Sequence, residues 1–456
     1  MVIQLFGLNG EACRPKRSAR NLAARSWCAD VRRFFRLINA DEVLGTHRVF
    51  SIMQTIAYLT SLYGRAGDTF IRVEVEQLRK LGFTVETFSI RAPSENEIVS
   101  DAVRRERQGT EDLLGTGIFS LVGSALSLAI SRPFRFARTL CLAIRIGTPG
   151  LRGRLWPMAY LLEACVLARR MQTKGVKHLH NHIGQNSAAV AMLASLLSDI
   201  PYSLTIHSTE FDVTETIALK EKIARSMFTV AICSLGRSQL MRWSAPEHWH
   251  KIHVVRCGLL SEFKLAKITD VPDVPRIVCV ARLIELKGHL MLIEAIAQLV
   301  KRGRKIELDL IGGGPFRSTV EAAIARHGLE SHVNLLGWKN SDEVRRIIES
   351  SRGFVLSSFH EGLPVSLMEA MALARPVIST NVGAISELIE HRKHGWLIPA
   401  GSVEALTAAL HEMLDAPVET LAQMGREGRE CVLRRHDAGH EALKLASFIT
   451  GTAKEN

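Results

Sequence analysis

The sequence predicts an α/β protein built from two doubly wound domains, each a parallel sheet covered by helices. Three observations lead to this prediction. The chain has 456 residues, which is too long for one ordinary core and fits two domains of about 200 residues each. Short β-branched runs alternate with helical patterns in two successive series. A segment with two prolines and no periodicity, residues 261–275, separates the two series.

The expected strands follow one another as two wound sheets require. In the first half they are residues 49–56, 84–90, 177–181, 202–206, 229–233 and 252–255. In the second half they are residues 277–281, 306–311, 333–336, 354–357, 376–380 and 396–398. Ligands of open α/β sheets bind beyond the carboxyl ends of the strands, so we expect the site in a cleft between the domains.

The same pattern sets the expected domain limits. The two Rossmann-like domains are expected over residues 48–260 and 276–435, joined by a linker over residues 261–275. A basic extension, residues 1–47, precedes the first domain, and a tail, residues 436–456, follows the second. The extension is rich in arginine but lacks the continuous apolar stretch of a signal peptide.

The composition is that of a folded globular protein with a basic surface. Hydrophobic residues make up 47% of the chain, charged residues 23%, and the formal net charge is +12. A basic surface suits nucleic acid, an anionic membrane or a phosphorylated substrate. The sequence has no zinc-finger spacing and no aromatic ribonucleoprotein motif, which argues against nucleic acid as a partner.

The eight cysteines are scattered, and several lie inside apolar runs. This distribution is typical of buried, reduced thiols in a cytosolic protein. Neither a Cys-x-x-Cys nor a His-Glu-x-x-His spacing occurs, so we expect no metal site.

Residues 117–147 combine a short apolar run with arginines. The apolar run has about 14 residues, fewer than the roughly 20 needed to cross a bilayer. Two interpretations stay open: an amphipathic pair of helices that contacts anionic lipid, or helices packed on the domain with their arginines in water. Together with the basic extension, the first interpretation places a cytoplasmic protein at the inner face of the cell membrane.

The most informative motif for chemistry holds two glutamates eight positions apart. Pro364 fits the first position of a helix, which puts Glu361 in the preceding loop and Glu369 on the second turn. Backbone amides of Gly362 and Leu363 at this helix start attract phosphate, and the carboxylates accept hydrogen bonds from sugar hydroxyls. The motif therefore indicates a nucleotide sugar, with solvated acids at a helix start as the alternative.

Further candidate ligands follow the strands expected in the second half. Arg282 and Lys287 suit a diphosphate, because a guanidinium fork and an ammonium group neutralise its charge, although a solvated basic loop explains them too. Gly312 opens a glycine turn that lets backbone approach a ligand, with a plain tight turn as the alternative. Gly337 stands where a nucleobase could lie against the backbone or against Trp338.

Histidines end two of the strands expected in the first half. His182 closes one strand region and His207 another, so both are expected to face the cleft. A neutral His207 would orient the reacting sugar and, near pH 7, exchange protons with it. The alternative is an imidazole bound to nearby backbone, since imidazoles both donate and accept hydrogen bonds.

Together these residues resemble glycosyltransferase family 4, the retaining enzymes with the GT-B fold, in which two Rossmann-like domains face each other across a cleft. Within that family, the exopolysaccharide and colanic-acid-type transferases are the most similar. The resemblance covers roughly residues 48 to 435, and its most specific part is the Glu-x7-Glu pattern of Glu361 and Glu369. The match in the first half, which includes residues 62–71 and 180–184, is looser.

The resemblance implies a role for each of these residues. The catalytic residues would be Glu361, which contacts the transferred sugar, and His207, near the anomeric centre. Glu369 would bind the ribose hydroxyls. Donor binding as a whole would involve Arg282, Lys287, Gly312, Gly337, Gly362, Leu363 and Glu369. The acceptor side of the cleft would include Gly64, Gly67 and His182, although Gly64 stands where the family commonly has proline.

The implied activity is that of a retaining, metal-independent hexosyltransferase. A nucleotide sugar would be the co-substrate, with no other cofactor. The acceptor would be a glycan, lipid-linked, in the synthesis of cell-surface or extracellular polysaccharide. Two alternatives remain, a nucleotide-sugar epimerase of similar architecture and a catalytically silent sugar-nucleotide-binding protein.

Overall fold

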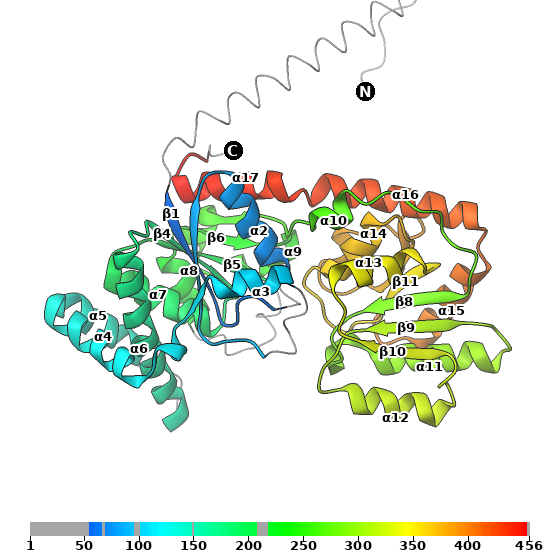
Figure 1. Cartoon of the computed structure of the whole chain (residues 1–456), viewed down its shortest axis with the longest axis horizontal. Helices are drawn as coiled ribbons and strands as arrows, with labels where there is room; N and C mark the ends of the chain where they lie inside the picture. The colour runs from blue at the N-terminus through cyan, green and yellow to red at the C-terminus, as the bar shows by residue number, and fades with distance from the viewer. Residues whose placement is uncertain (1–53, 66–68, 95–100, 148–149, 208–217, 454–456) are drawn as a thin grey trace, which may run out of the picture. The chain divides into compact units, whose positions relative to one another are not determined.

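The computed structural model describes residues 54–65, 69–94, 101–147, 150–207 and 218–453 (Figure 1). These residues form two parallel sheets with helices packed on both faces, which confirms the predicted fold class. The extension expected over residues 1–47 lies outside the described residues.

The first sheet has seven strands in the order β3-β2-β1-β4-β5-β6-β7, all parallel. They are β1 (Thr55–Thr60), β2 (Thr84–Ser89), β3 (Thr110–Asp112), β4 (His178–His182), β5 (Tyr202–Ile206), β6 (Thr229–Ala231) and β7 (Ile252–Val254). The strand order reverses between β1 and β4, so a crevice forms beyond their carboxyl ends.

The second sheet has six strands in the order β10-β9-β8-β11-β12-β13, again all parallel. They are β8 (Arg276–Val280), β9 (Glu307–Ile311), β10 (Val333–Gly337), β11 (Gly353–Leu356), β12 (Val377–Thr380) and β13 (Gly395–Ile398). Here the order reverses between β8 and β11, and the loops after these two strands meet.

The helices fall into two groups along the chain. Those around the first sheet are α2 (Thr69–Lys80), α3 (Asp101–Gln108), α4 (Ile118–Ser131), α5 (Pro133–Arg145), α6 (Leu151–Thr173), α7 (Asn186–Ser198), α8 (Leu219–Arg225) and α9 (Ser234–Trp243). Those that follow are α10 (Ser261–Lys264), α11 (His289–Lys301), α12 (Arg317–His327), α13 (Ser341–Glu349), α14 (Val365–Ala372), α15 (Val403–Asp415), α16 (Val418–Arg435) and α17 (Ala438–Thr450). Among the helices of the described residues, none has both the length and the apolar character needed to cross a membrane.

Eleven of the twelve expected strands coincide with an observed strand to within one or two residues. Residues 49–53 of the first expected strand lie outside the described residues, and the observed β1 extends to Thr60 because its buried apolar stretch continues through Leu59. Strand β3 is not among the expected strands. It has three polar residues at the edge of the sheet, and such a segment shows neither β-branched enrichment nor alternation.

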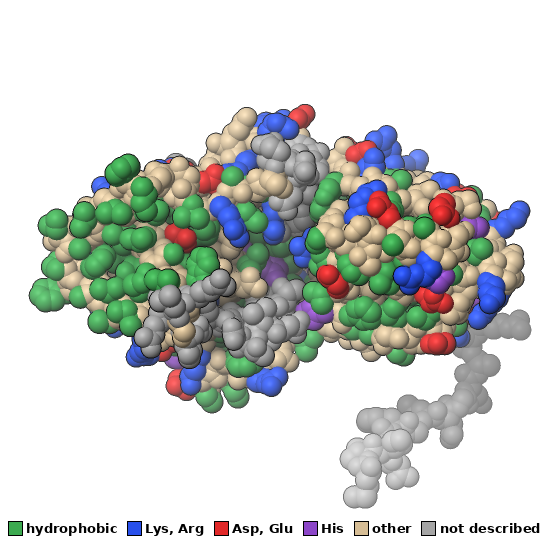
Figure 2. Space-filling view, turned by 90° about the horizontal axis from the view of Figure 1, so that it is seen from below, with side chains coloured by type: hydrophobic (Ala, Val, Ile, Leu, Met, Phe, Trp, Pro, Cys, Tyr) green, Lys and Arg blue, Asp and Glu red, His purple; other side chains and the backbone are tan. Residues whose placement is uncertain are grey.

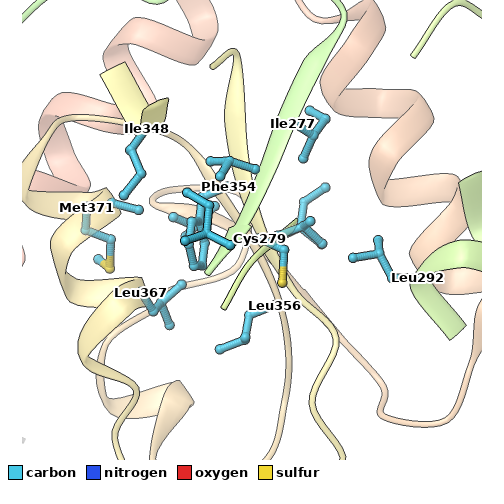
Figure 3. Packing of buried hydrophobic residues seen from close by; sticks show 14 of the residues in the cluster. Ile277, Cys279, Leu292, Ile348, Phe354, Leu356, Leu367 and Met371 are labelled. Atoms are coloured by element: carbon cyan, nitrogen blue, oxygen red, sulfur yellow. The ribbon is translucent and has the colours of Figure 1, made fainter. Parts of the chain in front are cut away.

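The core of the second domain fixes α14, the helix that carries Glu369. Leu367 and Met371 of α14 face Phe354 and Leu356 of β11, and all four side chains are buried (Figure 3). Burial of each such side chain stabilises the fold by about 1.5–3 kcal/mol. The helix is therefore a rigid support for the acid on its other face.

The last helix returns to the first domain. Helix α17 packs against α2, although the sequence predicts a tail there (Figure 1). Nδ1 of His436 lies 2.9 Å from the carbonyl oxygen of Cys257, and the amide of Arg256 donates to Glu441 Oε2 at 2.7 Å. These hydrogen bonds join α17 and the residue before its cap to the segment that follows β7 in the first domain.

Candidate functional site

A cavity of about 470 Å³ opens at the carboxyl ends of both sheets. Residues of α2 and of the loop after β5 line it from the first domain, and the loops after β8 and β11 line it from the second. Figure 2 shows a hollow between the domains with cationic and histidine side chains along it. A cavity of this size suits a ligand of several hundred daltons, because ligand pockets measure about 300–1,000 Å³.

Eight of the twelve predicted site residues line this cavity. They are His207, Arg282, Lys287, Gly312, Glu361, Gly362, Leu363 and Glu369. Three others lie apart from it. His182 is buried behind His207, Gly337 precedes the lining residue Trp338, and Gly64 lines a smaller neighbouring cavity. Gly67 is outside the described residues.

Lys287 and Glu361 form an ion pair in the cavity wall. The Lys287 Nζ lies 2.7 Å from Glu361 Oε1, and the hydroxyl of Ser358 donates to the same oxygen at 2.6 Å. The Glu361 residue is only 5% exposed, so its charge is held in place by these two partners. The cationic side chain of Lys287 and the anionic side chain of Glu361 are thus held in fixed positions next to each other.

A close backbone approach brings Lys287 to this position. Gly288 has φ of +64°, and a Cβ there would lie 2.1 Å from the carbonyl oxygen of Ser357. The amide of Phe359 donates to the carbonyl of Leu286 at 2.8 Å, which joins the loops after β8 and β11. Only glycine allows this approach, because any side chain would push the loops apart.

A second glycine supports Glu361 from the other side. Gly383 has φ of +57°, and a Cβ there would lie 1.8 Å from the carbonyl oxygen of Glu361. The amide of Ala384 donates to the carbonyl of Gly362 at 3.0 Å. The loop after β12 therefore holds the glutamate loop in place without lining the cavity itself.

Glu369 lies on α14 with its carboxyl group in a nearly dry setting. Burial raises the pKa of Glu369 to about 8, and the negative charge of Glu262 adds to the effect. The carboxyl is therefore mostly neutral at pH 7 and can both donate and accept a hydrogen bond. The helix begins at Val365, one residue later than predicted, because Pro364 adopts an extended conformation and caps it.

The glycine turn after β9 packs on the neighbouring strand end. A Cβ on Gly312, whose φ is +135°, would lie 2.0 Å from the carbonyl oxygen of Ala281. The amide of Gly312 donates to the carbonyl of Gly337 at 2.9 Å. Gly312 thus allows the close packing of two loops and also lines the cavity. Arg282, in the adjacent loop, lines the same cavity with an exposed side chain.

A chain of hydrogen bonds runs from α2 to His207. Glu74 Oε1 accepts from the hydroxyl of Tyr58 at 2.6 Å and lies 2.8 Å from His182 Nε2. His182 Nδ1 lies 3.0 Å from Nε2 of His207, which lines the cavity. A carboxylate only accepts, so Nε2 of His182 carries a proton. When His182 is neutral, its Nδ1 accepts the Nε2 proton of His207 and fixes that ring's tautomer.

The electrostatics of this chain keep Glu74 ionised and His207 neutral. Burial alone raises the pKa of Glu74, but the electrostatic interactions with His182 and His180 and the hydrogen bonds from His182 and Tyr58 together outweigh burial and hold this pKa at about 2. Burial is the main cause, and the nearby His182 the second, of a pKa of His207 lowered to about 3. Proton exchange by His207 near pH 7 is therefore disfavoured, whereas the expected neutral imidazole fits its surroundings.

The charge of Glu74 provides a direct test of this chain. Glu74→Gln keeps the shape of the side chain but removes the anion that orients His182. For the sugar transfer that the sequence resemblance implies, we expect kcat to fall on the order of tenfold with little change in the donor KM, because a hydrogen bond to a charged group contributes about 1.5–3 kcal/mol. Steady-state kinetics measures both constants.

Glu76→Gln is the matched control for Glu74→Gln. Glu76 lies on the same helix, but its carboxylate is half-exposed and pairs with Lys80 at 2.7 Å. Its replacement should leave kcat unchanged. An equal loss of kcat in both variants, or no loss in either, would contradict the proposed orienting chain.

Glu74, His180 and His182 also bring three possible metal ligands together. Their ligand atoms lie within 4.8 Å of one another, and no other such group occurs in the part of the chain that the structure describes. Both nitrogens of His180 already face hydroxyls, with Ser203 Oγ at 2.7 Å and Thr205 Oγ1 at 2.9 Å. These distances are those of a hydrogen-bonded network, so we assign the cluster to hydrogen bonding.

Several residues that line the cavity or support it are not among those predicted from the sequence. Arg65 and Arg72 line the cavity from the first domain, and Lys339 lines it from the second. Glu74 lies on the buried face of α2, three positions after Ile71 and four before Leu78. A glutamate at a core-facing position of an amphipathic helix is the signal that could have found it, because buried carboxylates require partners.

Comparison with known proteins relates the chain to one family. The family model for glycosyl transferases group 1 matches residues 261–431. The amylovoran biosynthesis glycosyltransferase AmsK of Erwinia amylovora is 38% identical over 231 residues, which is 49% of this chain and 56% of that relative. The chain thus spans little more than half the length of AmsK. The putative colanic acid biosynthesis glycosyltransferase WcaL of Escherichia coli K12 is 31% identical over 283 residues, 59% of this chain and 69% of that relative.

Solved structures show the same architecture. Anabaena Alr3699/HepE, crystallised in complex with UDP and glucose, has a TM-score of 0.65 and 14% identity, and the match covers 87% of this chain and 100% of HepE. Sucrose-phosphate synthase from Thermosynechococcus elongatus has a TM-score of 0.65 and 18% identity, over 88% of this chain and 99% of the synthase. At these identities the likeness concerns the fold.

Proposed function

Because the chain belongs to the group 1 glycosyltransferases with the GT-B fold, we propose that it moves a sugar from a nucleotide-sugar donor to a glycan acceptor. The observation that carries this proposal is the cavity wall at the ends of β8 and β11. It joins Lys287 and Glu361 in one ion pair and places Glu369 on the adjoining helix. Cations for a diphosphate and acids for sugar hydroxyls thus stand together in one place.

Five residues of the cavity wall have a proposed part in donor binding. Arg282 and Lys287 bind the diphosphate, and the amides of Gly362 and Leu363 help to hold it at the start of α14. Glu369 binds the ribose hydroxyls. Its neutral carboxyl matches a pair of hydroxyls because it donates to one and accepts from the other.

We propose that transfer retains the anomeric configuration. The bond between the anomeric carbon and the diphosphate oxygen breaks, and the diphosphate keeps the electron pair. The acceptor hydroxyl forms the new bond, and its proton passes to an oxygen of the leaving diphosphate. Glu361 positions the transferred sugar and His207 lies near the anomeric carbon as a hydrogen-bonding group. Lys287 and Arg282 offset the charge of the leaving group, and we propose that this needs no metal or other cofactor.

The acceptor is proposed to be lipid-linked. Arg65 and Arg72 line the cavity opposite the donor residues, and Nε of Arg72 is buried with no hydrogen-bond partner among the described residues. Two further cations suit a phosphate of the acceptor, since the donor diphosphate already has its own. The relatives AmsK and WcaL act, by name, in amylovoran and colanic acid biosynthesis. We therefore propose a role in exopolysaccharide synthesis, in the cytoplasm at the inner face of the membrane.

A donor panel tests this function. The purified chain is incubated with nucleotide sugars that differ in base and in sugar, and the products are read by mass spectrometry. We expect release of the nucleoside diphosphate from a small subset of donors, with the sugar passed to an acceptor or to water. Conversion of the free nucleotide sugar into an isomer, or binding with no turnover of any donor, would contradict the proposal. The anomeric configuration of the product, read by NMR, tests retention.

A further inference from the structure

Exposed apolar side chains gather on one part of the first domain. Ten of the twenty large hydrophobic side chains that are exposed among the described residues lie between positions 114 and 156. Figure 2 shows the region of α4, α5 and the start of α6 as a continuous hydrophobic surface. We call this surface the apolar face, and it comprises Leu114, Ile118, Phe119, Val122, Leu126, Ile130, Phe134, Ile144, Leu155 and Trp156. Apolar surface gathered in this way marks an interaction site.

Packing within the domain does not account for the apolar face. Helix α4 buries only Leu121, Ser124 and Leu128, while Phe119 is 91% exposed and Ile130 is 81% exposed on its other side. Residues 113–131 contain no charged side chain, so neither side of α4 is polar. A helix that is apolar all round is normally surrounded by apolar material on every side. Helix α4 has 14 residues, or about 21 Å, too short to span a hydrocarbon core of roughly 30 Å.

The charge around the apolar face has one sign. Residues 113–162 contain no aspartate or glutamate and six arginines, at positions 132, 135, 138, 145, 152 and 154. Two acids from neighbouring helices offset part of this charge, because Asp199 pairs with Arg135 at 2.7 Å and Glu221 pairs with Arg145. Among the arginines whose side chains the structure describes, at positions 132, 135, 138 and 145, two are paired in this way, which leaves an excess of about two positive charges beside the apolar face.

This charge distinguishes between the possible occupants. A second copy of the chain would bring its own arginines against those of the first copy, and like charges brought together at an interface disfavour association. An anionic bilayer supplies both partners at once, acyl chains for the apolar side chains and phosphates for the arginines. Arg135 and Arg138 also line a cavity of about 520 Å³ beside Phe134, together with Asp199, and a lipid headgroup fits a cavity of this size.

We infer that the apolar face docks on an anionic lipid bilayer, with α4 and α5 lying in the plane of the interface. Phe119, Ile130 and Phe134 insert among the acyl chains, and Trp156 lies at the level of the headgroups, where tryptophan is enriched. Docking would hold the cavity near a lipid-linked acceptor, and only this benefit of docking rests on the proposed function. Lipid binding itself is measured without any sugar.

Vesicle flotation of the full-length chain tests the inference. We expect the chain to float with vesicles that contain phosphatidylglycerol and phosphatidylcholine, and to bind at least tenfold less to phosphatidylcholine alone. In the double variant F119S/F134S, binding to the anionic vesicles should fall by about tenfold or more, because two large apolar side chains no longer insert. Arg138→Glu should weaken binding to the anionic vesicles and leave binding to phosphatidylcholine unchanged.

The matched control is the double variant L265S/I268S, which removes two exposed apolar side chains outside the apolar face. It should float like the unmodified chain. No flotation of the unmodified chain, equal binding to both kinds of vesicle, or an equal loss in the control would overturn the inference. So would a dimer, measured by light scattering, that F119S/F134S dissociates while flotation stays unchanged. Donor turnover in F119S/F134S, measured without vesicles, should persist, so failure of the proposed function is seen separately.

Discussion

Lys287→Ala is expected to reduce sugar transfer by about 10²–10³-fold, because it removes a preorganised cation from the leaving diphosphate. The effect should fall on kcat more than on the donor KM, since the charge of the leaving group is largest in the transition state. Transfer assays with the donor identified from the panel measure both constants. Lys301→Ala, which removes an exposed cation at the end of α11, is the matched control and should transfer normally.

The same substitution should also destabilise the fold, and a second one separates the two effects. Without Lys287, the buried carboxylate of Glu361 keeps only its hydrogen bond from Ser358. Loss of one partner from a buried ion pair costs about 3 kcal/mol. Adding Glu361→Gln to Lys287→Ala should recover much of the free energy of unfolding, measured in urea, but no transfer. Recovery of transfer in the double variant would show that the pair has a structural role alone.

Glu369→Gln is expected to stabilise the protein at neutral pH and to leave donor binding nearly unchanged. The pKa of Glu369 is about 8 in the fold, against an ordinary value of 4.5. As pH rises from 4.5 to 8, the unfolded chain loses this proton while the folded chain retains it, so Glu369 increasingly disfavours folding. At pH 7 the cost is about 3 kcal/mol, at roughly 1.4 kcal/mol per pH unit. Glutamine carries no charge and avoids this cost.

Urea unfolding at several pH values checks this prediction. The stability gained by Glu369→Gln should be large at pH 7–8 and should vanish near pH 4, where the carboxyl is protonated in both states. The donor KM should change little, because the amide of glutamine, like the neutral carboxyl, donates one hydrogen bond and accepts another. Glu419→Gln, at an exposed position in α16, should change neither quantity. A gain that is equal at pH 4 and pH 8 would contradict the buried, neutral carboxyl.

Much of the fold could be predicted because its signals are local. The buried strands of parallel sheets are largely apolar, so segments such as β8 and β11 stand out in the sequence. Strand β3 does not, because an edge strand of three polar residues has no buried pattern to display. The last helix, α17, has a clear apolar pattern and an Asp437 cap, but its return to α2 depends on surfaces far away in the chain.

The sequence by itself determined the wound fold and identified eight of the residues that line the cavity. Glu361, Glu369, Arg282 and Lys287 follow strand ends, and a parallel sheet brings such ends to one edge whatever the details of packing. Only the tertiary structure decided which of these groups touch. The Lys287–Glu361 pair, the link from Glu74 through His182 to His207, and the exposure of the apolar face depend on strand order and helix packing. These arise from contacts between residues far apart in the chain, which local propensity does not encode.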